Sequence, residues 1–243
     1  MGRLIVVVSG KGGVGKSTVS VGLATAFCNC GRKVLLVDAD EGLRCLDSLL
    51  SVSDRLVFDS SDVIDRNVDL EKAILQVDKV KGLSLLPAPD KLCFNKTGFV
   101  DIVASLTDKY DYVILDCPAG IDLEYMYGFK DKGEYIVVTN FDRVSVRDAG
   151  IANSLFDSLN LKNVGLIVNR FIYKNVKKLN INFDEIINNT GVRLLGVVPE
   201  DILIQTSALN GNPFFFGKAA MAFQRISARI EDKDVLLPKI RKI

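Results

Sequence analysis

At residues 10–18 the chain reads Gly10-Lys11-Gly12-Gly13-Val14-Gly15-Lys16-Ser17-Thr18, just after the apolar run Leu4-Ile5-Val6-Val7-Val8. The stretch fits the pattern G-x-x-x-x-G-K-[ST], and helical periodicity begins at its lysine. The glycines let the backbone curl so that successive N–H groups point inward, and the helix N-terminus adds a positive partial charge. Strand, loop and helix therefore predict a phosphate-binding loop. The alternative, a glycine-rich turn without a ligand, is disfavoured because the whole pattern matches in the right context.

The side chains of this loop suggest separate roles. We expect all of Gly10–Thr18 to surround a nucleotide polyphosphate, with Lys16 reaching the β- and γ-phosphates and the Ser17 hydroxyl binding Mg²⁺. Lys11 cannot easily share the same γ-phosphate with Lys16. It could instead extend toward the nucleotide of a facing subunit and act as a positive charge in trans. The alternative for Lys11 is a solvated surface lysine.

The rest of the chain alternates short apolar runs with helical periodicity, which predicts an α/β fold with a doubly wound, mainly parallel sheet and helices on both faces. Strands are expected at residues 4–8, 34–38, 83–87, 112–116, 135–139, 164–168 and 194–198. Helices are expected at residues 16–30, 97–109, 145–159, 183–190 and 217–231. In the first helix, Val19, Leu23, Phe27 and Cys30 should form one buried stripe that stops at Gly31. We expect a single P-loop NTPase domain over residues 1–232 and a short tail over residues 233–243.

Composition limits the chemistry. The 243 residues include no histidine, which excludes Ser-His-Asp catalysis, histidine bases and imidazole metal sites. Lysine and arginine number 31 and aspartate and glutamate 30, so no overall basic field is available to hold nucleic acid. The five cysteines lack C-x-x-C spacing, and neither a signal peptide nor an apolar run long enough to span a membrane is evident. A cytoplasmic protein is expected.

Aspartates follow two of the expected strands. Asp116 ends one apolar run, where open α/β sheets bind ligands, and it fits a Walker B carboxylate that holds Mg²⁺ directly or through water. Asp38 and Asp40 close the second strand. Strand-end aspartates also act as turn formers or helix caps, so that alternative stands beside a catalytic one.

These motifs resemble the MinD/ParA family of ATPases, whose deviant Walker A motif matches Lys11–Thr18. The similarity extends over residues 38–47, 116–121, 139–140, 145–148, 169–170 and 199–201 and runs from residue 1 to about residue 230. The resemblance implies an ATP-dependent homodimer in which Asp40 orients the attacking water and Asp38 supports the magnesium shell. It also implies that Asn169 and the loop Pro199–Asp201 contact adenine, although strand-end capping and a turn are the alternatives.

Guanine recognition is not expected. The candidate stretch Asn95-Lys96-Thr97-Gly98 lacks the aspartate of N-K-x-D and precedes Asp116 in the chain. Adenine is therefore the expected base. The expected site thus has Lys11, Lys16 and Asp40 as catalytic residues and Ser17, Asp38 and Asp116 around Mg²⁺, with ATP as the nucleotide.

The resemblance is strongest to the division-site branch of the family, which implies an ATP-hydrolysing switch with a division-inhibitor protein and a topological-factor protein as partners. Contacts would come from the helix near Ser145, Arg147 and Asp148. Two departures, Cys45 for asparagine and Phe141-Asp142 for a proline-glutamate pair, leave those partners open. The alternatives are a DNA- or cargo-segregation ATPase, for which the lysines at 174, 177 and 178 offer a basic cluster, and a nucleotide-gated scaffold with little hydrolysis.

The tail departs from the family pattern as well. An amphipathic membrane helix is expected at this end, but Pro238 would interrupt it, and the five residues that follow are too few for a stable helix. Three basic residues after Leu237, namely Lys239, Arg241 and Lys242, could still attract an anionic leaflet. Peripheral binding to the inner face of the cell membrane is one expectation, and a tail that packs or frays is the other.

Overall fold

The computed structural model describes residues 2–41, 44–89, 95–176, 182–209, 216–239 and 243. Its centre is an eight-stranded sheet of order β3-β4-β2-β5-β1-β6-β7-β8, parallel except for the antiparallel pair β3–β4. The strands are β1 (Arg3–Val8), β2 (Val34–Asp38), β3 (Leu75–Gln76), β4 (Leu83–Leu86), β5 (Tyr112–Asp116), β6 (Gly133–Asn140), β7 (Val164–Phe171) and β8 (Arg193–Pro199). The predicted doubly wound, mainly parallel sheet is confirmed.

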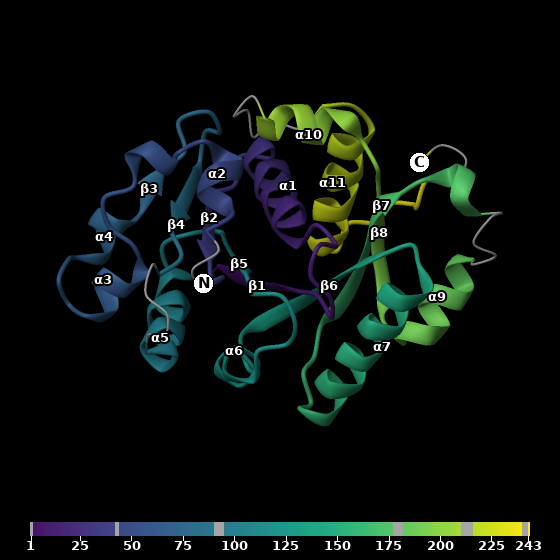
Figure 1. Ribbon diagram of the computed structural model, residues 1–243, viewed down its shortest axis with the longest axis horizontal. Helices are drawn as coiled ribbons and strands as arrows, with labels where there is room; N and C mark the ends of the chain where they lie inside the picture. Colours follow the sequence, from purple (N-terminus) through teal and green to yellow (C-terminus); the bar gives the residue numbers. More distant parts are fainter. Residues whose placement is uncertain (1, 42–43, 90–94, 177–181, 210–215, 240–242) are drawn as a thin grey trace.

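Helices cover both faces of the sheet (Figure 1). One face packs against α1 (Lys16–Asn29), α2 (Leu46–Leu50), α10 (Ile202–Leu209) and α11 (Gly217–Ile230). The other packs against α3 (Ser60–Ile64), α4 (Leu70–Ala73), α5 (Lys96–Leu106), α6 (Leu123–Gly128), α7 (Arg143–Ser158) and α9 (Phe183–Thr190). The central strands β1, β2 and β5 are buried almost throughout, which is why their sequences read as continuous apolar runs.

The expected strands and the five expected long helices are all present, with ends that shift by up to three residues. Elements that the sequence analysis did not predict are short: β3, α2, α3, α4, α6 and α10. Four of these lie within residues 41–81, between β2 and β4. Helices of four to six residues, such as α2, α3, α4 and α6, complete too few turns to establish a 3.6-residue pattern, so tertiary contacts decide where they form.

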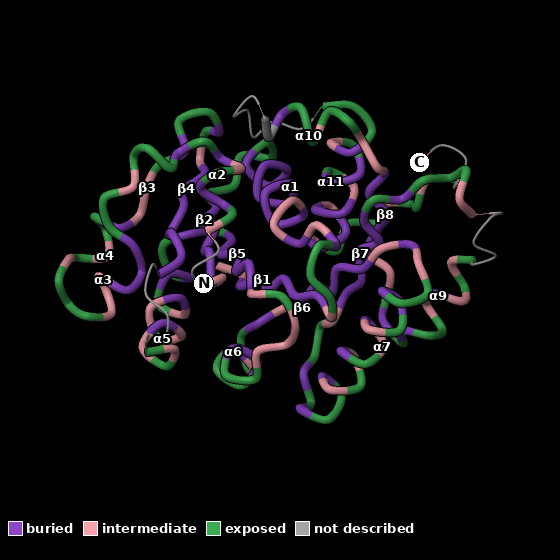
Figure 2. The backbone as a smooth tube through the Cα atoms, viewed as in Figure 1, coloured by how far each residue is buried: buried purple, intermediate pink, exposed green. Residues whose placement is uncertain are grey.

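The first helix shows one wrong prediction. Its start at Lys16 and its stop at Gly31 are confirmed, because Gly31 has φ +79° and the N–H groups of Gly31 and Arg32 donate to the carbonyls of Cys28 and Phe27 in a Schellman end. Cys30, however, is exposed, since it is the cap residue and lies past the last packed turn. The helix is buried nearly all round (Figure 2) because the sheet lies on one side and α2 and α11 lie on the other.

Strand order places the loop after β1 at a topological switch point. The chain leaves β1 through α1 for β2, whereas β5 inserts between them, so β1 pairs with β5 and β6. The carboxyl ends of β1, β2 and β5 therefore meet at one edge of the sheet, with Asp38 in register beside Asp116. Ligands bind at such an edge in open α/β sheets.

The tail folds back on the domain. Residues 233–239 form no helix, as Pro238 predicts, and Arg229 Nε donates to the Val235 carbonyl at 2.7 Å. The basic positions 241 and 242 lie outside the described residues, as do 177 and 178 of the lysine cluster. Among the helices that the structure describes, none is both long and apolar enough to cross a membrane.

Candidate active site

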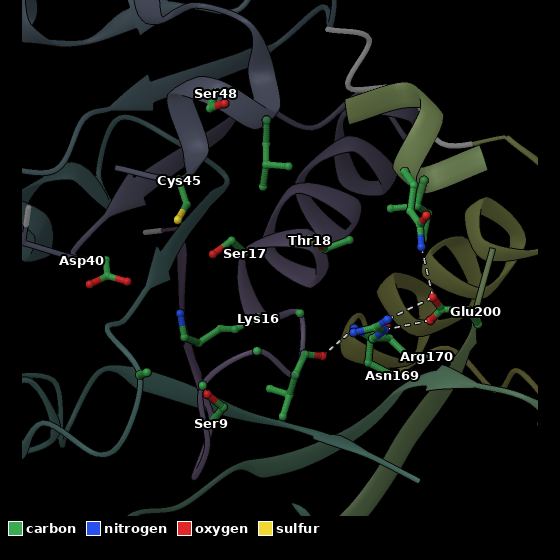
Figure 3. A pocket seen from close by; sticks show the side chains of 18 of the residues that line it. Ser9, Lys16, Ser17, Thr18, Asp40, Cys45, Ser48, Asn169, Arg170 and Glu200 are labelled. Atoms are coloured by element: carbon green, nitrogen blue, oxygen red, sulfur yellow. Dashed lines mark hydrogen bonds and ion pairs between the residues drawn. The ribbon is translucent and has the colours of Figure 1, made fainter. Parts of the chain in front are cut away.

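A cavity of about 680 Å³ opens at the carboxyl edge of the sheet (Figure 3). Its walls include the predicted residues Gly12, Gly13, Val14, Gly15, Lys16, Ser17, Thr18, Asp40, Asn169, Pro199 and Asp201. Gly10, Lys11, Asp38 and Asp116 do not line it. The fold thus gathers segments from residue 9 to residue 205 into one site, with the phosphate loop on one side and the ends of β7 and β8 on the other.

The phosphate loop has the backbone that its glycines allow. Gly13 and Gly15 have φ of +80° and +89°, in the left-handed region. Asn169 Nδ2 donates to the Val14 carbonyl at 2.8 Å, and a Cβ on Gly15 would lie 2.3 Å from that same nitrogen. Position 15 therefore requires glycine for two reasons: the left-handed backbone conformation and the close approach of the Asn169 side chain.

Lys16 reaches the end of β5 from the first turn of α1. Its Nζ lies 3.3 Å from Asp116 Oδ1, which also accepts from Ser20 Oγ at 2.9 Å. Burial by itself lowers the pKa of Lys16, but the charge of Asp116, the hydrogen bond to it and the other nearby acidic groups together outweigh burial, and the pKa is raised. Among the described residues, the buried Asp116 Oδ2 has no hydrogen-bond partner. The lysine stays charged, and Asp116 keeps an oxygen free for a further cation.

Asp38 is 1% exposed and holds the segment that follows it. Its Oδ1 accepts from the Asp40 N–H at 3.0 Å, and its Oδ2 accepts from the N–H groups of Cys45 and Leu46 at 3.2 and 3.1 Å. Burial, together with the neighbouring Asp116 charge, raises the pKa of Asp38 to about 7. The helix-cap alternative thus describes its contacts in this structure. Its place near Mg²⁺ stays a prediction.

Asp40 is half-buried and lines the cavity on the Lys16 side, across from Asn169, Arg170 and Glu200 (Figure 3). Burial raises its pKa, and the Lys16 charge opposes that shift. A carboxylate in this place can accept a hydrogen bond from a water inside the cavity. Its role in orienting the attacking water stays a prediction.

The start of the loop faces away from the cavity. Lys11 is exposed, and a Cβ on Gly10 would lie 2.6 Å from the Asp148 carbonyl oxygen, so α7 packs directly behind the loop. Gly10 therefore supports the loop from behind. The position of Lys11 is compatible with the predicted reach into a facing subunit, which stays a prediction.

The opposite wall of the cavity combines ligand-facing and structural side chains. Asp201 accepts from the N–H groups of Leu203 and Ala219 at 3.0 and 3.3 Å and so holds the starts of α10 and α11, as the turn alternative suggested. Arg170 and Glu200 form a bidentate ion pair with nitrogen–oxygen distances of 2.9 and 3.2 Å. The predicted adenine contacts are in the cavity wall but stay predictions.

Several lining residues were not predicted: Ser9, Arg44, Cys45, Ser48, Leu49, Ala119, Arg170, Ile204 and Gln205. Most belong to α2, α10 or the neighbouring loops, which the sequence pattern did not reveal. Arg44 is held in the cavity wall by contacts that no local sequence pattern predicts. Its Nη2 donates to Asp59 at 3.0 Å, and its Nε donates to the Ala88 carbonyl at 3.2 Å.

Helix α7, expected to carry partner contacts, begins behind the loop. Asp142 caps it by accepting from the Ser145 N–H at 2.9 Å and from the Ser145 hydroxyl at 2.7 Å. Ser145 is buried, whereas Arg147 is 73% exposed and Asp148 lies beside it. Only Arg147 and its exposed neighbours are therefore available to a partner directly.

A parallel sheet, a glycine loop that opens a helix, and a buried Walker B aspartate together define a P-loop ATPase. Residues 5–214 match the family described as the CobQ/CobB/MinD/ParA nucleotide binding domain, and the chain belongs to this family. The septum site-determining protein MinD of Synechocystis is 37% identical, over 97% of this chain and 91% of that protein. The predicted family, the ATPase activity and the use of ATP with Mg²⁺ are confirmed.

Solved structures agree. The MinC:MinD cell division protein complex of Aquifex aeolicus matches with a TM-score of 0.88 at 30% identity, covering 98% of this chain and 99% of that one. The septum site-determining protein MinD of Pyrococcus horikoshii, complexed with Mg-ADP, matches with a TM-score of 0.83 at 30% identity, covering 95% and 96%. This chain is therefore similar to MinD proteins along nearly its whole length.

Proposed function

We propose that this chain is an ATP-driven switch that positions the cell-division site: two copies close around two ATP molecules, and hydrolysis opens the pair. The observation that carries the proposal is the cavity, in which a charged Lys16 anchored on Asp116 faces the polar ends of β7 and β8. The similarity to septum site-determining proteins supports the cellular role.

The phosphate end supplies the chemistry. The backbone N–H groups of residues 12–18 and the Lys16 ammonium bind the phosphates and offset charge that develops on the γ-phosphoryl oxygens. Asp40 accepts a hydrogen bond from a water and directs the water's oxygen toward the γ-phosphorus. Because the chain has no histidine, a carboxylate is the side chain available for this task.

The residues present fit a magnesium ion. Asp38 and Asp116 are buried side by side, Lys16 contacts Asp116 Oδ1, and among the described residues Asp116 Oδ2 has no partner. Asp116, Asp38 and the Ser17 hydroxyl are the groups that would hold the ion, either directly or through water. When bound, Mg²⁺ polarises the phosphoryl oxygens and neutralises their charge.

Lys11 completes the site of the facing subunit. It is exposed and does not line the cavity of its own chain, so it is available to a second copy. A lysine that arrives only with the partner makes hydrolysis depend on dimerisation, and hydrolysis then removes the phosphate that holds the pair together.

Two exposed surfaces support the proposed protein partners and the proposed membrane location. On α7, Arg147 and Ile151 are 73% and 61% exposed beside the predicted inhibitor and topological-factor site. At the tail, Leu236 is 85% exposed next to the basic C-terminus, which supports peripheral binding to the inner face of the cell membrane by a cytoplasmic protein. Co-sedimentation with anionic vesicles in ATP and in ADP, with and without residues 233–243, tests the membrane step.

DNA segregation has less support, because the net charge is +1.

The switch is tested with two variants. Asp40→Ala should bind ATP and accumulate as a dimer without hydrolysing it, whereas Lys11→Ala should bind nucleotide but stay monomeric and inactive. Single-turnover hydrolysis and sedimentation in ATP measure both. Lys162→Ala, which removes an exposed lysine at the opposite edge of the sheet, is the control. Wild-type turnover in both variants would contradict the mechanism.

A further inference from the structure

Lys96, the first residue of α5, has no role in the site described so far. The pair Asn95-Lys96 was excluded as a guanine motif, and neither residue lines the nucleotide cavity. Asn95 instead caps α5, because its Oδ1 accepts from the Gly98 N–H at 3.0 Å. The lysine beside it points into a cluster of carboxylates.

Lys96 contacts three acidic side chains at once. Its Nζ lies 2.6 Å from Asp122 Oδ2, 3.5 Å from Glu41 Oε1 and 3.7 Å from Glu124 Oε2. The Tyr125 ring lies 5.5 Å from the same nitrogen. Lys96, Glu41 and Asp122 are all half-buried, whereas Glu124 is 66% exposed. The hydrogen bond to Asp122 raises the pKa of Lys96, so the lysine stays charged.

The two closer carboxylates come from the two segments that build the reactive end of the cavity. Glu41 directly follows Asp40. Asp122 ends the loop that leaves β5, and it holds the start of α6 by accepting from the N–H groups of Glu124 and Tyr125 at 3.0 and 3.3 Å. Between Asp116 and Asp122, Ala119 lines the cavity, and the Gly120 N–H donates to the Ser9 carbonyl at 3.1 Å. The Asp122 loop is therefore fixed to the phosphate loop.

We propose that Lys96 is a positioning residue for ATP hydrolysis, one that ties Glu41, and with it Asp40, to the loop that leaves β5. The proposal rests on the role of Asp40 in the proposed function. Without the ammonium, Glu41, Asp122 and Glu124 would repel one another. The loop after β5 is held by Ser9 and by α6. The Asp40 N–H is held by Asp38 Oδ1 at 3.0 Å, so the group displaced by the repulsion would be Glu41, and with it the side chain of Asp40. Asp40 would then lose its place relative to the γ-phosphate.

Rates and affinities of substituted proteins distinguish a positioning role of Lys96 from a role in folding. Lys96→Gln should slow single-turnover hydrolysis roughly tenfold, since a catalytic group displaced by a fraction of an ångström loses that much or more. ATP affinity should stay at the wild-type value, because Lys96 does not line the cavity. Lys96→Arg keeps the charge and should restore most of the rate. The control is Lys109→Gln, which removes a 2.6 Å bond between exposed Lys109 and Glu71 just after the same helix.

A second pair of variants tests the route through Glu41. Glu41→Gln should slow hydrolysis to a similar extent, and the double variant Lys96→Gln/Glu41→Gln should be no slower than the slower single variant, because both remove one contact. Glu124→Gln, at the longest distance and exposed, should have the wild-type rate. Three results would each overturn the proposal. The first is a double variant whose loss of rate is the product of the two single losses, the second is failure of Lys96→Arg to restore the rate, and the third is a wild-type rate in Lys96→Gln. Wild-type turnover in Asp40→Ala would instead overturn the proposed function itself.

Discussion

The two ends of the nucleotide cavity are built on different principles. At the phosphate end, buried charged groups contact one another: Lys16 is 8% exposed, and Asp38 and Asp116 are at most 1% exposed. At the base end, where adenine contacts are predicted, the ion pair joins exposed Arg170 to half-buried Glu200, and Asp201 holds the starts of two helices. Charges that are buried together demand fixed geometry, because an unpaired one is costly.

The difference explains where each end is sensitive. The phosphate end should tolerate almost no change in shape, whereas the base end should tolerate loss of its surface ion pair. Asn169 joins the two ends, because it lies at the end of β7 and donates to the Val14 carbonyl. Substitutions at the phosphate loop, at the junction and at the buried aspartates therefore test the comparison.

The largest effect is expected from Gly15→Ala. Its Cβ would meet Asn169 Nδ2 at 2.3 Å in a backbone with φ +89°, so the loop must change shape to accept it. Gly13→Ala is the matched control, because φ is +80° there but nothing lies within 4 Å of the added carbon. Gly13→Ala should weaken ATP binding by roughly five- to thirtyfold, the equivalent of about 1–2 kcal/mol of backbone strain. Gly15→Ala should lose far more in calorimetric titration. Equal losses would show that the Asn169 contact is unimportant.

An intermediate effect is expected from Asn169→Ala. The change removes the hydrogen bond to the Val14 carbonyl and loosens the loop, so ATP affinity should fall by roughly tenfold, the equivalent of about 1–1.5 kcal/mol. Glu200→Gln, which weakens the pair with exposed Arg170 and alters the 3.2 Å bond from Gln205 Nε2, should change affinity by about 0.5 kcal/mol or less. Fluorescent-nucleotide displacement measures both. If Glu200→Gln proved the more damaging, the contrast between the two ends would be wrong.

A smaller effect is expected in the pH dependence of stability. The pKa of Asp38 is raised from 3.8 to about 7 by burial and by Asp116. Between those values the native carboxyl holds a proton that the unfolded chain has released, so the free energy of unfolding falls as pH rises through this window. Without nucleotide or Mg²⁺, Tm should therefore decrease from about pH 5 to about pH 7.5.

Asp38→Asn should flatten that slope. Its Tm should be lower throughout, because one of the two oxygens that accept from backbone N–H groups is lost. The control is Asp111→Asn, which removes an exposed carboxylate that accepts from the Lys33 N–H at 2.7 Å. Its slope should match the wild type. An unchanged slope in Asp38→Asn would mean that the buried carboxyl is ionised throughout.

Much of the fold was predictable because local patterns of apolar residues and glycines determine it. Buried parallel strands read as apolar runs, the long helices show their periodicity, and Gly31 ends α1 as expected. The short helices α2 and α10 were missed, and with them the cavity residues Ser48, Leu49, Ile204 and Gln205. Such helices are too short to be stable alone, so only packing against α1 and its neighbours determines them.

The sequence by itself determined the phosphate loop, the strand-end aspartates and the family, because a glycine-rich turn between a strand and a helix is a local requirement of phosphate binding. The tertiary structure decided what those side chains touch. It set Asp38 beside Asp116 and placed both carboxylate oxygens of Asp38 on backbone N–H groups. It also brought Asn169 to Val14 and joined Glu41 to Asp122 through Lys96. Among these contacts, those between distant segments join residues 26 to 155 positions apart or strands paired out of chain order, and only the assembled sheet brings them within reach.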